Sequence, residues 1–216
     1  MASMSARPKP FSLPSRQRPL PPEEMPASFL PAPEVQAWIR AQIFAEDGAL
    51  HNPDHKHLLD ADLAVLWAHE GFESKGRTVI GQAEELMFRC NRWQRGRQEQ
   101  QMAQWFGRVP EYLLTFDASY SAKCSDIEWC ALVEHELYHV AQKRDDFGAP
   151  AFTKDGRPKL GIVAHDVEEF VGVVRRYGPG SAGGNLARLI EAGKSAPEVG
   201  RVAIAGACGT CLLRVA

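Results

Sequence analysis

Two histidines four residues apart, with a glutamate directly after the first, carry the clearest chemical signal in the sequence. They are His135 and His139 in the stretch LVEHELYHVA, where Glu136 completes the pattern H-E-x-x-H. On a helix, residues four apart lie on nearly the same face, about 6 Å apart along the axis. Two imidazoles at that spacing can bind one Zn²⁺, and the glutamate can act as general base toward a zinc-activated water. The pattern therefore predicts a zinc metallopeptidase that hydrolyses peptide bonds.

A catalytic zinc site needs a third protein ligand, and the stretch AHDVEEF supplies the candidates on a second predicted helix. His165 follows His139 by 26 residues, and Glu168 and Glu169 share its helical face. We expect His165 to complete the site, while Glu169 or Glu168 stays open as the alternative third ligand. The carboxylates that do not bind the metal could orient an imidazole through its other nitrogen.

HELYH followed by HDVEEF resembles the phage metallopeptidase family and, more distantly, the SprT-like (Spartan-type) zinc metalloproteases. The resemblance is specific in the two motifs and implies that His165 is the third zinc ligand. It implies an α+β fold, a minimal zincin-like domain whose small, mostly antiparallel sheet packs on the HExxH helix and on a second ligand-bearing helix. It also implies a phage or prophage origin. Asp166 stands where SprT-like proteins usually have glycine, and the spacing between the motifs is longer than theirs.

Hydrophobic periodicity predicts the elements that must position these residues. The expected elements are a helix over EVQAWIRAQIFA, adjacent strands within 63–72 and 76–85, a helix in ELMFRCNRWQRGRQEQQ, a strand within 110–120, the HExxH helix from about 126 to 143, with the motif in its middle, and a second helix over IVAHDVEEFVGVVRRYG. YLLTF comes just before the HExxH helix, and the resemblance to zincin-like folds implies an edge strand there, where an extended polypeptide could bind by β-augmentation. The polar stretch with His51, His55 and His57 is expected to be a solvent-exposed loop.

Composition divides the chain into three parts. Residues 1–33 hold nine of the 15 prolines and few large apolar side chains, which predicts a disordered tail. Residues 34–178 should form the metallopeptidase domain, and 179–216 a linker and short tail with a CxxC pair, Cys208 and Cys211. One such pair supplies only two of the four ligands of a structural zinc, so its role stays open.

The bulk properties are those of an ordinary globular protein, with 44% hydrophobic residues and a net charge of −2. We expect a cytoplasmic protein, in the host cytoplasm if phage-encoded, because no segment is apolar enough for a membrane span or a signal peptide and the cysteine count is odd. The partner is a polypeptide substrate, and the oligomeric state is open. Two alternatives remain: a DNA-associated protease acting on DNA-bound proteins, supported by a basic tail and the arginines at 89–97, and a non-catalytic metal-binding interaction module.

Overall fold

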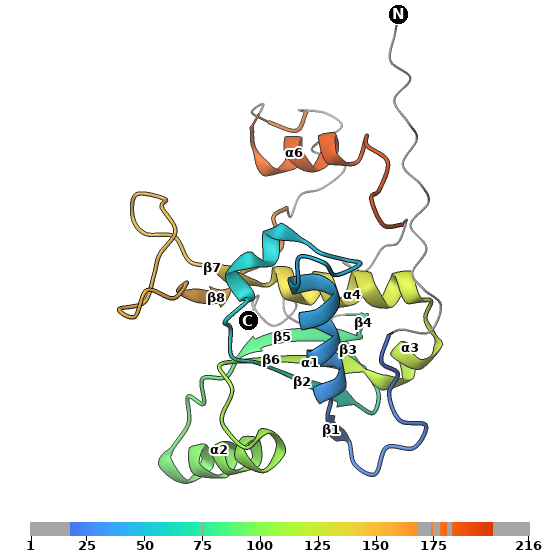
Figure 1. Ribbon diagram of the computed structural model, residues 1–216, viewed down its shortest axis with the longest axis vertical. Coiled ribbons are helices and arrows are strands. Elements are labelled where there is room, and N and C mark those ends of the chain that lie inside the picture. The colour runs from blue at the N-terminus through green and yellow to red at the C-terminus, as the bar shows by residue number, and fades with distance from the viewer. Residues whose placement is uncertain (1–17, 75, 168–173, 175–177, 181–182, 201–216) are drawn as a thin grey trace, which may run out of the picture. The chain divides into compact units, whose positions relative to one another are not determined.

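The computed structural model describes residues 18–74, 76–167, 174, 178–180 and 183–200 (Figure 1). Residues 18–164 belong to the larger of two compact units, and the described residues from 165 onward belong to the smaller one. The smaller unit contains the helix α6 (Asn185–Ala192). Helices and small sheets together give an α+β fold, as the sequence predicts. None of the described helices is long and apolar enough to cross a bilayer.

A four-stranded sheet lies at the centre of the larger unit, with the strand order β1-β2-β6-β5. The antiparallel pairs are β1 with β2 and β5 with β6, while β2 and β6 run parallel. Two of the three pairings are antiparallel, which confirms a small, mostly antiparallel sheet. The strand bounds are β1 (Phe29–Pro31), β2 (Leu63–Ala68), β5 (Gly81–Glu85) and β6 (Tyr112–Asp117).

The strand order corrects two expectations. The runs that contain β2 and β5 were predicted to be neighbours, but β6 lies between them, and the turn region forms its own hairpin of β3 (Phe72–Ser74) and β4 (Arg77–Val79). The stretch YLLTF, predicted at a sheet edge, is the internal strand β6. The physical reason is that β6 is buried on both of its faces, which suits a strand with a neighbour on each side.

Helices cover both faces of this sheet. On one face, Trp67 of β2 donates from its indole nitrogen to Glu34 of α1 (Pro33–Ile39), at 2.9 Å. The ring of Trp38 on α1 meets Trp129 of α4 (Asp126–Tyr138) edge-on, at 4.7 Å between centroids, so these two helices lie side by side. On the other face, α2 (Arg92–Phe106) packs its last turn on a cluster formed by Ala64, Leu66 and Leu113, with Leu86, Trp105 and Phe106 against it. The π-helical turn η1 (Arg40–Phe44) continues α1, as the long apolar run predicts.

The helix α4 (Asp126–Tyr138) carries the HExxH motif and begins where the sequence indicates. Ser125 and Glu128 form a reciprocal capping box, in which the Glu128 carboxylate accepts from the Ser125 backbone at 2.8 Å. The helix ends at Tyr138 and not near residue 143, because Val140–Gln142 form β7 and pair with β8 (Leu160–Ile162). The motif therefore lies at the end of the helix and not in its middle.

Arg18, the first described residue, bonds to the start of α4 and to the end of the short helix α3 (Ala118–Lys123), which precedes α4. Its side chain is only 8% exposed and donates to Asp126 Oδ1 at 2.6 Å and to the carbonyls of Ser121 and Cys124 at 2.8 Å. The guanidinium also lies 5.6 Å from the centroid of the Trp129 ring. Composition predicts a disordered tail here because it counts the apolar residues that could be buried. It does not reveal that one arginine makes several hydrogen bonds to the folded domain. The three-part division of the chain stays a prediction, and residues 1–17 lie outside the described residues.

Arg18→Ala is expected to lower the free energy of unfolding by about 1–3 kcal/mol, because two carbonyls and a carboxylate lose a charged donor in a part-buried site. Urea denaturation followed by circular dichroism measures this change. Arg95→Ala is the matched control, since the Arg95–Glu99 pair is exposed and its loss should leave the curve nearly unchanged. Identical midpoints for wild type and Arg18→Ala would show that Arg18 does not anchor the segment.

Candidate metal centre

Two of the three candidate ligands come from the last turn of α4. His135 lies within the helix, and His139 is its C-cap residue, with a helical backbone at φ −67° and ψ −21°. The two ring centroids are 5.1 Å apart and the rings are nearly perpendicular, at 76°. His139 is buried and His135 is half-buried. The spacing of four residues therefore brings the two imidazoles together even though the helix ends between them.

The third candidate, His165, lies in a stretch without regular secondary structure that follows β8. This corrects the expectation of a ligand-bearing helix that begins at Ile162 and includes His165. An apolar run such as LGIVA suits a strand as well as a helix, and its pairing with β7 decides for the strand. Most of the remaining predicted helix, including Glu168 and Glu169, lies outside the described residues, so the alternative third ligand stays a prediction.

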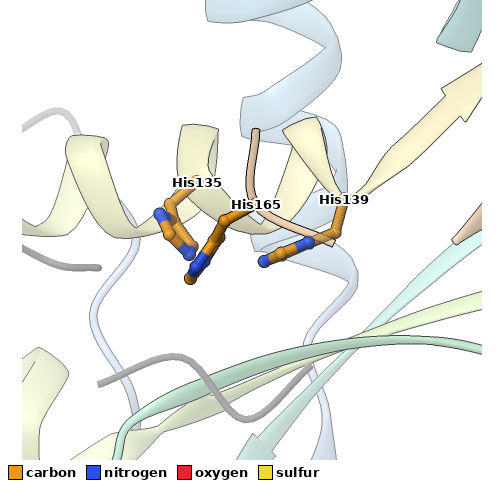
Figure 2. Close-up of side chains that lie close together, drawn as sticks. All are labelled: His135, His139 and His165. Carbon is orange, nitrogen blue, oxygen red and sulfur yellow. The ribbon is translucent and has the colours of Figure 1, made fainter. Parts of the chain in front are cut away.

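One ring nitrogen from each of His135, His139 and His165 lies within 4.8 Å of the other two. Figure 2 shows the three imidazole rings gathered beside the end of α4. Three histidine nitrogens at this separation are close enough to bind one metal ion. This donor set also fits the metal by its chemistry, because neutral imidazole is a common ligand of first-row divalent ions.

A backbone carbonyl orients His139 for this role. Its Nδ1 lies 2.7 Å from the carbonyl oxygen of Val163. A carbonyl only accepts, so Nδ1 carries the proton and Nε2 keeps the lone pair that a metal requires. The Val163 backbone N–H donates in return to the His139 carbonyl, at 2.9 Å. The β7–β8 hairpin thus selects the tautomer of His139 as well as its position.

Glu136 is fully buried, and the first residue of β5 makes room for it. A Cβ atom on Gly81 would lie 2.9 Å from Glu136 Oε1 and 2.8 Å from Leu132 Cδ1, which is closer than real Cβ contacts allow. Gly81 therefore permits the strand to pass directly against the Glu136 carboxylate. Sequence reasoning did not single out Gly81; the available signal was a glycine at the start of a strand, which often marks a close approach.

The polar stretch around His55 is not the exposed loop that the sequence predicts. Residues Pro53–Leu58 form the 3₁₀ turn η2, and His55 is only 1% exposed. The ring of Tyr138 covers it at 4.6 Å between centroids. Burial, together with the nearby His57, lowers the pKa of His55 to about 4, so it is neutral at physiological pH. None of His51, His55 and His57 belongs to the metal-competent group found among the described residues.

The arginines at 89–97 and the cysteines do not belong to the group of three histidines found among the described residues. Arg89, Arg92 and Arg97 are exposed and make no ion pair within the described part of the chain, whereas Arg95 pairs with Glu99 at 2.6 Å. Cys90, Cys124 and Cys130 are free thiols, and burial raises the pKa of Cys130 to about 12, which suits a packing residue. Cys208 and Cys211 lie outside the described residues.

The comparisons with known proteins give one family. The family described as "Putative phage metallopeptidase" matches residues 36–194, a span that includes HELYH, HDVEEF and well over half of the chain. No curated protein and no solved structure matches the chain. The more distant SprT-like resemblance stays a prediction. Because the match spans most of the chain and covers both histidine motifs, this protein belongs to the phage metallopeptidase family.

Proposed function

We propose that this protein is a zinc-dependent peptidase in which His135, His139 and His165 hold the metal and Glu136 is the general base. The observation that carries the proposal is the group of three histidine nitrogens within 4.8 Å of one another. Three protein ligands, which leave a fourth position open, are typical of catalytic zinc sites, whereas structural sites use four. A purely structural or interaction site would have no need of a buried carboxylate directly after the first ligand.

The reaction is the hydrolysis of a peptide bond. Zinc, when bound, supplies a lowered water pKa and polarises the carbonyl of the scissile peptide. The Glu136 carboxylate takes a proton from the attacking water and gives it to the amine nitrogen as the C–N bond breaks. The water oxygen ends in the new carboxylate, so no covalent acyl-enzyme forms.

Burial of Glu136 supports this role. The side chain lies against β5 at Gly81 and is fully shielded from bulk solvent in this structure. A base held in one place by packing loses little entropy when it meets its proton donor, which favours proton transfer. We further propose that the substrate is a polypeptide and that the enzyme is phage- or prophage-encoded and acts in the host cytoplasm.

The metal content of five proteins, the wild type and four variants, tests the ligand set. Plasma emission spectroscopy should find about one zinc per chain in the wild type and in Glu168→Ala and Glu169→Ala, but a loss of zinc in His165→Ala. His69→Ala, which removes an exposed histidine elsewhere, is the control. If a glutamate variant loses zinc and His165→Ala keeps it, that glutamate and not His165 is the third ligand. A wild type without zinc after reconstitution would contradict the whole proposal.

Glu136→Gln should retain zinc and lose peptidase activity by roughly 10²–10⁴-fold, because the amide cannot take up the proton of the attacking water. Cleavage of a fluorescently labelled unfolded protein measures the activity, and metal analysis is done on the same preparation. Glu134→Gln, a neighbouring glutamate on α4 outside the motif, is the control and should stay active. Equal activity in Glu136→Gln and wild type would exclude Glu136 as the base.

Gly81→Ala should lower activity by about tenfold or more while zinc content stays the same. The added methyl would overlap Glu136 Oε1 and Leu132 Cδ1, and a displaced catalytic group costs rate steeply. Gly96→Ala is the matched control, since nothing lies within 4 Å of its Cβ position and alanine favours the helix. A fully active Gly81→Ala would show that the close approach at β5 does not position the base.

A further inference from the structure

The second histidine of the motif lies at a place where the helix alone cannot hold it. Because α4 ends at Tyr138, His139 is a capping residue followed directly by β7. Helix ends fray, and the last four carbonyls of a helix lack partners within it. Metal–ligand distances tolerate an error of only about 0.2 Å. Contacts from outside the helix must therefore fix the backbone around His139.

The Val163 backbone bonds to His139 itself, and a second set of contacts reaches its two neighbours. This second set comes from one short segment, Asn52–His57, which includes the first five residues of η2 (Pro53–Leu58). On one side of His139, the Tyr138 hydroxyl donates to Asp54 Oδ2 and accepts from Asn52 Nδ2, both at 3.0 Å. On the other side, the carbonyl oxygen of Val140 lies 2.8 Å from His57 Nε2. A carbonyl only accepts, so His57 Nε2 is the donor. The residues immediately before and after His139 are thus held by the same segment.

The segment is itself well supported. Asn52 Oδ1 accepts from the Asp54 backbone at 3.0 Å, which caps the 3₁₀ turn. The Asn52 backbone N–H donates to the carbonyl of Ile43 on η1 at 3.1 Å. His55 fills the space beneath the Tyr138 ring and is buried. Because this segment is hydrogen-bonded to η1 and packed around the buried His55, it can restrict the movement of the end of α4.

We propose that Asn52, Asp54 and His57 are positioning residues that fix the backbone on both sides of His139 and thereby raise the affinity of the histidine group for its metal. The inference rests on the proposed function, since it takes His139 as a metal ligand. The stretch with His51, His55 and His57 then contributes to the site through hydrogen bonds to the neighbours of His139, and its histidines do not bind the metal. A merely structural role would instead lower the stability of the whole protein and leave metal affinity alone.

The test compares zinc affinity with stability in the full-length chain. The double variant Tyr138→Phe/His57→Ala removes the hydrogen bonds to both neighbours of His139 but keeps the ring that covers His55. Zinc affinity is measured by competition with a chromophoric chelator, and the melting midpoint is measured on the zinc-free protein. The double variant should bind zinc about 10–100-fold more weakly, as loss of outer partners does in other metal sites.

Asn91→Ala is the matched control, because Asn91 caps α2 with two hydrogen bonds and has no contact with α4 among those described. It should lower the melting midpoint and leave zinc affinity unchanged. The inference is overturned if the double variant binds zinc within about twofold of wild type, or if Asn91→Ala weakens zinc binding as much. In both of those cases the wild type still binds zinc, so the proposed function stands. A wild type that binds no zinc would overturn both.

Discussion

The backbone of β5 passes α4 so closely at Gly81 that no side-chain carbon fits between them. This contact joins the sheet to the HExxH helix at the Glu136 carboxylate. The position of β5 follows from its pairing with β6, and that of α4 from its buried residues and its contact with α1. The register of β5 in the sheet therefore constrains the position of the Glu136 side chain. A shift of either one must displace the other, because the two are in close contact.

Local signals in the sequence were sufficient for much of the fold and for the candidate ligands. The capping box at Ser125, the amphipathic run that became α1 and η1, and the apolar strand β6 all depend on residues close in the chain. His135 and His139 share a face because of helical geometry alone. His165 could be named from a motif, and the structure brings its ring within reach of the other two.

What the sequence could not supply depends on partners far along the chain. The end of α4 at Tyr138 is decided by the pairing of β7 with β8, whose residues lie about twenty positions later. The insertion of β6 between β2 and β5 likewise requires knowing which strand is buried on both faces. Histidine burial shows the same limit. His55 and His139 are both buried, yet one is enclosed by an aromatic ring and the other is oriented by a carbonyl, and only the second arrangement suits a ligand.

The two halves of the site differ in how far apart their contacts lie along the chain. The His139 ring is oriented by Val163, 24 positions later, whereas the contact of Glu136 with β5 requires β5 to pair with β6 and β2 to pair with β6 across almost fifty residues. The residues on either side of His139 bond in addition to the segment Asn52–His57, more than eighty positions earlier. Contacts between residues close in the chain cost less loop-closure entropy than contacts between distant residues, so they form faster. On this ground we expect the bond between His139 and Val163 to form earlier in folding than the contact between β5 and Glu136. Under the proposed function, the general base would thus reach its place late in folding, when little of the chain itself is left extended as a substrate.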